Sequence, residues 1–314
     1  MFDMLQPPED LVPDRLQTAL TKRFLLPALP SVEAALLEIR AETDAILAPG
    51  ATARRDKPYP YGYCYEITAD VIGRLRQAAA RRRSPGERAL DAFFRHGGRG
   101  TLIWGALRGL YLQNAIQFGP LYVDVSNDTV DVNKAKVEIL PMAESGFELL
   151  RDAAHFAQIV ERYWDTRAYA NTALPSLAPL FPVLLADRAG NVLLQSNTGY
   201  MMRLLGTDGF RRSERWLRES PAPSDLVVRE LRAHCPADIL AANPQTGLEA
   251  AIAACHKLRQ DRTRIDEAWV ERMRADFDRV PMIRIIHPPN PAGDKAMLAD
   301  ANPHLGEGVS AAHI

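Results

Sequence analysis

Hydrophobic and polar positions along this chain repeat with two different periods. In the first fifty residues apolar side chains recur three or four positions apart, as at Leu16, Leu20 and Phe24 and again at Leu36 and Ile39. This spacing places them on one face of a helix. A helical pattern also runs from Cys64 to the arginines at 81–83, where Ser-Pro-Gly at 84–86 ends it, and a further helix is predicted at 87–95.

The middle of the chain changes to the period of a β-strand. Segments 110–118, 121–125 and 135–140 are rich in β-branched and aromatic residues with partial alternation, and Gly119-Pro120 separates the first two. Another pair of apolar segments, within 183–195, is joined by the turn sequence Asp187 to Gly190. The pattern predicts one central antiparallel sheet built from strands between 101 and 140 together with 182–195.

Helical patterns dominate the rest of the chain. They are predicted at 144–162, 214–218, 224–233, 246–259 and 266–279, followed by a strand at 282–286. The fold class is therefore α+β, with N-terminal helices, a central antiparallel sheet and a mostly helical C-terminal half. The expected divisions are a helical segment at 1–57, an α+β core at 58–200, a helical region at 201–286 and an irregular tail at 287–314.

Composition narrows the classes of function. The chain has 314 residues, a formal net charge of -1 and a pI near 6.7, which gives no overall attraction to nucleic acid or to an anionic membrane. No apolar run approaches the roughly 20 residues of a membrane span, and the N-terminal sequence lacks the features of a signal peptide. We expect a cytoplasmic protein with no nucleic-acid or membrane partner. No cofactor is predicted, because no glycine fingerprint for a nucleotide is present.

Basic residues are concentrated locally. Between Arg54 and Arg108 there are twelve Lys or Arg against five Asp or Glu, whereas the first fifty residues carry eight acidic and four basic side chains. Most of these charges are expected on solvated helix faces. The three cysteines, Cys64, Cys235 and Cys255, are widely spaced and predict neither a disulfide framework nor a metal knuckle.

Cys64 is the strongest candidate for chemistry. It stands in the aromatic, glycine-containing segment 59–66, directly before a helical pattern. The unpaired amides and the dipole at a helix start favour a thiolate, and the flanking Tyr61 and Tyr63 are candidates to contact a substrate. A small buried cysteine and ordinary packing tyrosines explain the same pattern without chemistry.

A thiol nucleophile needs a base, and histidine is the usual one. His96 lies nearest to Cys64 in the sequence, in the segment Arg-His-Gly-Gly-Arg, and is the candidate base, although a plain surface histidine fits the same segment. His155 stands in the apolar-rich stretch 153–157 and is interpreted as a helix residue at a packing boundary. No distinguishing partners are found in the sequence for His234, His256 and His287.

The order of these elements resembles the papain-like and transglutaminase-like cysteine superfamily over residues 58–130. In that superfamily a Gly-x-Cys loop opens a helix, and later strands bring a histidine and then an aspartate. Gly62 and Cys64 match the loop, and Asp124 matches the aspartate that orients the base. Asn114 stands on the strand where the histidine is expected, and an asparagine is not a general base near neutral pH. The resemblance implies acyl transfer or amide hydrolysis.

The segment 124–133 clusters carboxylates and amides, as a site for a hard cation would. Thr129 and Ala135 replace the glycine and the bidentate glutamate of a calcium-binding loop, and a polar hairpin turn explains the segment as well. Asp128 and Asn114 are also candidates to hydrogen-bond a substrate.

Three hypotheses follow. The leading one is a cysteine-dependent acyltransferase or amidohydrolase acting on a small molecule or peptide, with Cys64 as nucleophile, His96 or another histidine as base and Asp124 as orienting carboxylate. The second is a non-enzymatic binding or scaffold protein that contacts a protein partner through the 59–65 loop and the basic helix. The third is a metal-dependent enzyme with Asp124 and Asp128 as ligands.

Overall fold

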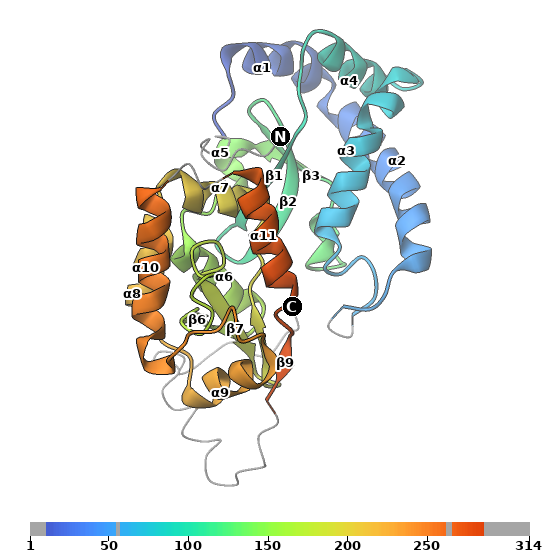
Figure 1. Cartoon of the computed structure of the whole chain (residues 1–314). Coiled ribbons are helices and arrows are strands. Elements are labelled where there is room, and N and C mark those ends of the chain that lie inside the picture. Colours follow the sequence, from blue (N-terminus) through green and yellow to red (C-terminus); the bar gives the residue numbers. More distant parts are fainter. Residues whose placement is uncertain (1–10, 55–56, 262–265, 286–314) are drawn as a thin grey trace, which may run out of the picture. The chain divides into compact units, whose positions relative to one another are not determined.

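The computed structural model describes residues 11–54, 57–261 and 266–285 of the chain. Contacts within it define two compact units. The N-terminal unit contains the described residues up to 151 together with 158–163, and the C-terminal unit contains 152–157 and 164–285. Helices and antiparallel strands occur in both units, which confirms the α+β fold class (Figure 1). The predicted tail at 287–314 lies outside the described residues, and the other predicted domain boundaries stay predictions.

Helices make up much of the N-terminal unit. They are α1 (Arg15–Leu20), α2 (Leu29–Leu47), α3 (Cys64–Ala80), α4 (Pro85–Arg95) and the short α5 (Met142–Ser145), with π-helical or 3-10 turns at Thr21–Leu25, Leu26–Ala28, Ala48–Gly50 and Asn127–Thr129. Ser84 and Glu87 form a capping box at the start of α4, as the sequence Ser-Pro-Gly-Glu favours. Gly86 lets α4 approach α2 closely, because a Cβ atom there would lie 1.8 Å from the carbonyl oxygen of Ser31.

A five-stranded antiparallel sheet completes this unit in the order β4-β3-β2-β1-β5. Its strands are β1 (Thr101–Leu107), β2 (Tyr111–Phe118), β3 (Leu121–Asp124), β4 (Glu138–Pro141) and β5 (Phe147–Glu148). Every residue of β2 is buried. Ile116 and Phe118 belong to the core that contains the helices, whereas Tyr111 and Ala115 belong to a second core on the opposite face. Successive side chains of this strand therefore enter different cores.

The predicted helix at 144–162 is wrong in its first half. Gly146 adopts a left-handed conformation, with φ of 70°, and ends α5 there. Phe147 then pairs with Leu107 in the sheet, and helix α6 begins only at Ala153 and runs to Tyr163, contributing residues to both units. Sequence periodicity did not separate these short elements, because each is only a few residues long.

The C-terminal unit has its own sheet and its own core. The sheet order is β6-β7-β8-β9, formed by Thr166–Ala170, Val183–Asp187, Asn191–Leu194 and Ile283–Arg284. The helices are α7 (Gly199–Thr207), α8 (Arg211–Glu219), α9 (Asp225–His234), α10 (Gly247–Gln260) and α11 (Glu267–Asp278), with a 3-10 turn at Pro244–Thr246. The prediction of a single central sheet is therefore wrong, because the 183–195 hairpin pairs with β6 and β9 instead of with the strands at 101–140.

Cys235 and Cys255 are buried in this second unit. Cys255 belongs to its apolar core, where burial raises the pKa of the thiol to about 12. The neighbouring His256 instead places its Nε2 atom 3.1 Å from Glu214. Adjacent helical positions point in different directions, so these two side chains serve separate environments.

Within the described parts of the chain, no helix combines the length and the apolar character needed to cross a bilayer.

Candidate functional site

Cys64 is the first residue of α3, as the sequence predicts. The preceding Tyr63 does not cap the helix with its side chain, and the loop before it is fastened at several points. The main-chain N–H of Gly62 donates to the carbonyl oxygen of Thr129 at 2.9 Å, which ties this loop to the turn after β3. Arg54 donates to the carbonyl oxygen of Gly62 and forms an ion pair with Glu66 at 2.6 Å. The thiol is thus presented from a well-anchored helix start.

The sheet brings Asn114 to Cys64. The Nδ2 atom of Asn114 donates to the Cys64 sulfur at 3.4 Å, although 50 residues separate the two in sequence. The carbonyl oxygen of Asn114 accepts hydrogen bonds from the hydroxyls of Thr68 and Ser126, each at 3.3 Å. Strand β2 is therefore bonded to the first two turns of α3 at this residue. Position 114, where the superfamily resemblance expects a histidine, does face the thiol, and the amide of Asn114 occupies it.

The environment of the Cys64 thiol does not favour its ionised form. Burial raises its pKa, the hydrogen bond from Asn114 lowers it, and the negative charge of Asp124 raises it again, with a net increase. The residue as a whole is half-buried, and desolvation is the largest of these effects on its pKa. The helix-start position alone predicts a lowered thiol pKa, and desolvation acts against that effect.

His96, the predicted base, is placed elsewhere. It is exposed just after the end of α4, its ring stacks on Phe24 at 4.7 Å between centroids, and its Nδ1 atom lies 2.7 Å from the carbonyl oxygen of Ala92. Phe94, two residues earlier, packs under Arg76, which is twelve residues along α3 from Cys64. Twelve helical residues span about 18 Å, so this end of α4 is far beyond hydrogen-bond reach of the thiol. The assignment of His96 as base is corrected accordingly.

Asp124 lies on the opposite face of the sheet from Asn114. Its neighbour two residues away, Tyr122, belongs to the second core, whereas Val123 and Val125 belong to the helix side. The carboxylate, fully buried, accepts from four donors: Gln113 Nε2 at 2.7 Å, Tyr122 Oη at 3.1 Å, and Ser126 N and Oγ at 2.8 and 3.1 Å. In the part of the chain that the structure describes, no hydrogen bond joins Asp124 to Asn114. The aspartate fixes the turn after β3 and does not orient a base.

Burial raises the pKa of Asp124 to about 6, while its hydrogen bonds from Gln113, Ser126 and Tyr122 lower it. All of these donors are neutral groups, so the charge of the carboxylate has no cationic partner in its hydrogen-bond shell. The same pattern raises the pKa of the Tyr122 hydroxyl, through burial first and then through the adjacent carboxylate.

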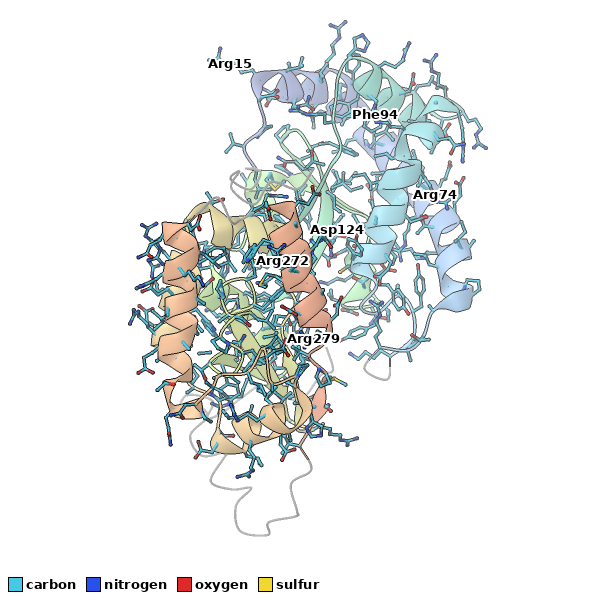
Figure 2. All side chains as sticks on the ribbon, viewed as in Figure 1. Arg15, Arg74, Phe94, Asp124, Arg272 and Arg279 are labelled. Atoms are coloured by element: carbon cyan, nitrogen blue, oxygen red, sulfur yellow. The ribbon has the colours of Figure 1, made fainter. Side chains whose placement is uncertain are left out.

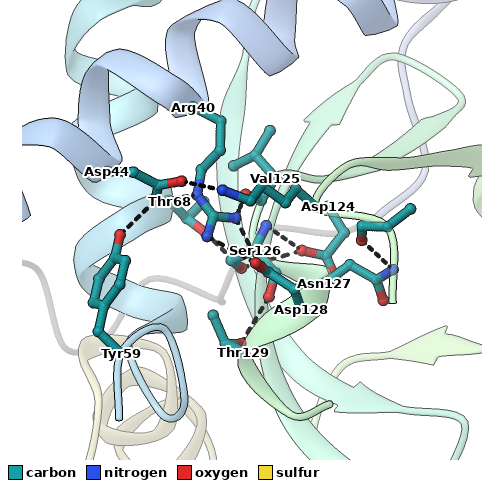
Figure 3. Close-up of polar contacts among 12 residues, drawn as sticks. Arg40, Asp44, Tyr59, Thr68, Asp124, Val125, Ser126, Asn127, Asp128 and Thr129 are labelled. Carbon is teal, nitrogen blue, oxygen red and sulfur yellow. Dashed lines mark hydrogen bonds and ion pairs between the residues drawn. The ribbon is translucent and has the colours of Figure 1, made fainter. Parts of the chain in front are cut away.

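Asp128 is paired with Arg40, a residue that the sequence interpretation missed. The two guanidinium nitrogens of Arg40 contact the two oxygens of Asp128 at 2.8 and 3.1 Å, and Arg40 also donates to the carbonyl oxygen of Val125 at 2.7 Å and to Asp44 at 2.7 Å (Figure 3). The Arg40 side chain is 0% exposed. Although burial opposes its charge, these carboxylates raise its pKa.

This pairing corrects two predictions made for Asp128. A buried carboxylate held at both oxygens by Arg40 is not free to contact a substrate or to ligate a metal. Among the described residues no cluster of three or more His, Cys, Asp or Glu side chains is arranged to hold a metal ion. The signal for Arg40 was present in the sequence, because it follows Ile39 and lies four residues after Leu36 on the buried side of α2.

Asp44 extends the same network to the aromatic loop. It accepts from the hydroxyl of Tyr59 and from the ammonium of Lys136, each at 2.6 Å, as well as from Arg40. Burial raises the pKa of Asp44, but its bonds to Lys136, Tyr59 and Arg40 outweigh this and hold the pKa below its ordinary value. Helix α2, the turn after β3 and the loop before Cys64 are therefore joined through one chain of polar contacts (Figure 3).

The tyrosines around Cys64 have different roles. Tyr63 is buried, its hydroxyl donates to the carbonyl oxygen of Thr52 at 2.9 Å, and Arg54 stacks over its ring at 3.8 Å. Tyr61 is half-buried, with the Lys57 ammonium 4.5 Å from its ring centroid. Tyr65 is 58% exposed. Tyr63 is thus a structural residue, while Tyr61 and Tyr65, both within the predicted 59–65 contact segment, reach the surface.

Two buried side-chain atoms near this site have no hydrogen-bond partner among the described residues. They are Oε1 of Gln113 and Oδ1 of Asn127. Their amide nitrogens are both bonded, to Asp124 and to the carbonyl oxygen of Ala135 respectively. Each of these amides therefore holds its segment through the side-chain nitrogen.

Comparison with known proteins gives no relative. No family model matches the chain, and neither a curated protein nor a solved structure matches it. The site is therefore interpreted from its own geometry.

Proposed function

We propose that this chain is a non-enzymatic binding protein that carries a degenerate cysteine site at Cys64. The observation that supports this most directly is the hydrogen bond from Asn114 Nδ2 to the Cys64 sulfur. An amide N–H gives a hydrogen bond but does not take up a proton near neutral pH, so this neighbour does not activate the thiol as a base would. Desolvation, which raises the pKa of the thiol, acts in the same direction.

The proposed contact surface is the 59–65 loop. Its backbone is held by the bond from Gly62 to Thr129 and by the Tyr59 hydroxyl on Asp44. Tyr61 on this fixed loop is half-buried, and in the adjoining first turn of α3 Cys64 is half-buried and Tyr65 is exposed. Tyrosines on a rigid loop supply a large contact area at a small cost in conformational entropy, which is why they are enriched at binding surfaces. A protein or peptide partner fits this surface.

The first test measures how fast Cys64 reacts with iodoacetamide as a function of pH, with the modified residue located by mass spectrometry. We expect the wild-type rate to rise only at the pH of an ordinary or less acidic thiol. The Asn114→His variant places an imidazole where the superfamily resemblance expects one, and should speed the reaction at about pH 7 by about tenfold or more, because an ordinary thiol is only a few per cent ionised there.

Asn114→Gln is the matched control for that experiment, because it keeps the amide and supplies no base. It should react as slowly as the wild type. Rapid alkylation of wild-type Cys64 at about pH 6 would refute the proposal that the cysteine site is degenerate.

The second test concerns binding. A photo-crosslinking amino acid placed at Tyr65 should capture one defined protein in an extract of the source cells, and Tyr61→Ala in the same chain should reduce that adduct. Leu110, which is exposed in the turn between β1 and β2, is the control position for the same amino acid. Equal labelling from positions 65 and 110 would mean that the loop has no binding role.

A cysteine-dependent acyl transfer remains the second candidate function. It is favoured by the position of Cys64 at the first residue of α3, where main-chain amides can stabilise an oxyanion, and by a donor aimed at its sulfur. The alkylation profile separates the two candidates, because only an activated thiol reacts well below the pH of an ordinary one.

A further inference from the structure

Two helical faces of the N-terminal unit expose charges of opposite sign around apolar side chains. The first, called here the basic face, belongs to α1 and the helical turns that follow it, and consists of Arg15, Leu16, Ala19, Lys22, Arg23 and Leu26. The second, called the acidic face, belongs to α2 and consists of Glu33, Ala34, Leu37, Glu38 and Ala41. All of these residues are exposed.

The basic face combines positive charge with exposed leucines. Leu16 and Leu26 are 55% and 43% exposed, and no acidic residue occurs between Arg15 and Pro30. Neither Arg15 nor Lys22 forms an ion pair with any residue that the structure describes, and Arg15 projects from the surface (Figure 2). The buried side of the same helical segment is occupied by Leu20 and Leu25. The exposed Leu16 and Leu26 are therefore not part of the core.

The acidic face has the complementary arrangement. Leu37, which is 41% exposed, lies among alanines, while Glu33 and Glu38 lie on either side of this apolar strip at helical spacing. Neither glutamate is in an ion pair within the described chain. The opposite side of α2 supplies Val32, Leu36 and Ile39 to the core, so the exposed side is a separate surface.

We propose that the basic face of one copy of this chain binds the acidic face of a second copy. The acidic face has an apolar strip with a glutamate on either side, and the basic face intersperses leucines with its cations, so both combine apolar contact area with charge as protein–protein interfaces do. The charges are opposite and otherwise uncompensated, so the two faces attract one another. Because the surfaces differ, the contact is head-to-tail, and it leaves one face of each kind free on every pair.

A second copy accounts for both faces at once. A nucleic acid or an anionic membrane fits the basic face alone and leaves the acidic face without a partner. The proposal is independent of the chemistry of Cys64, because none of its residues contacts that site. Its failure therefore leaves the proposed function untouched, and the reverse also holds.

The test measures self-association of the full chain by sedimentation velocity over a range of concentrations. We expect assembly that weakens about tenfold or more between about 0.05 M and about 0.5 M salt, because exposed charges are screened at the higher concentration. Lys22→Glu/Arg23→Glu and Glu33→Lys/Glu38→Lys should each reduce self-association by about tenfold or more. An equimolar mixture of these two variants should assemble again, because each supplies the charge that the other now needs.

Arg88→Glu is the matched control, since Arg88 is exposed on α4 and bonds only main-chain oxygens in the described structure. It should assemble like the wild type, and circular dichroism should show that all variants are folded. A wild-type chain that is monomeric at every concentration, or variants that assemble unchanged, would overturn the proposal. A mixture that fails to assemble would overturn it as well.

Discussion

At the residue scale, the sheet decides what Asn114 and Asp124 can do. The two are ten positions apart in the sequence and lie on the neighbouring strands β2 and β3, yet they face different cores. Asn114 contacts the Cys64 sulfur, whereas Asp124 is fully buried among the neutral donors of Gln113, Tyr122 and Ser126. A carboxylate in this environment holds its proton to an unusually high pH.

This predicts how stability depends on pH. The pKa of Asp124 is about 6 in the folded chain and about 3.9 in an unfolded one, so the folded state binds more protons between these values. Its contribution to stability is therefore complete below about pH 4 and is lost as the pH rises through about 6, by about 3 kcal/mol in total.

Asp124→Asn removes this titration while keeping an acceptor oxygen. Urea unfolding of both proteins at about pH 4 and about pH 7.5 is the measurement. The free energy of unfolding of the wild type should fall relative to that of the variant by about 2 kcal/mol over this interval, because the unfolded carboxyl is already half ionised at about pH 4. Parallel pH profiles of the two proteins would contradict the buried, unpaired carboxylate.

At the scale of elements, Arg40 is the contact that fixes α2 against the turn after β3. Its guanidinium bonds both oxygens of Asp128, the carbonyl oxygen of Val125 and one oxygen of Asp44. Asp44 in turn holds Tyr59 in the loop before Cys64. The orientation of the α3 start, which carries the Cys64 thiol, therefore depends on the buried ion pair between Arg40 and Asp128.

Arg40→Met tests this role. Removing one partner leaves Asp128 charged and buried, so we expect a loss of about 3–5 kcal/mol in the free energy of unfolding, measured with urea. Arg40→Met/Asp128→Leu should recover at least half of that loss, because an apolar pair of similar volume carries no desolvation cost.

Arg74→Met is the control for this experiment. Arg74 pairs with Asp70 four residues earlier on α3, and its side chain is 32% exposed. Such a pair contributes about 1 kcal/mol or less. If the Arg40 variant lost no more stability than the Arg74 variant, Arg40 would not be the fastening that its contacts indicate.

At the scale of the whole molecule, the chain forms two compact units, each with its own antiparallel sheet. The helix-to-strand order was correctly predicted in several places because long amphipathic segments, such as those of α3 and α10, repeat strongly over several turns. The single-sheet prediction was wrong because alternation along a strand reports burial and says nothing about the partner strand. Strands β6 and β9, which complete the second sheet, are five and two residues long.

The sequence by itself determined the α+β class, the helix start at Cys64 and the presence of Asn114 where a histidine was expected, because these depend on local spacing and residue type. Only the tertiary structure decided that Asn114 contacts the thiol, that His96 lies at the far end of another helix and that Asp128 belongs to Arg40. The reason is physical. Asn114 and Cys64 are 50 positions apart, and Arg40 and Asp128 are 88 positions apart. Local periodicity carries no information about contacts between residues so distant in the sequence. At Cys64 the same tertiary burial opposes the helix-start effect that local sequence predicts.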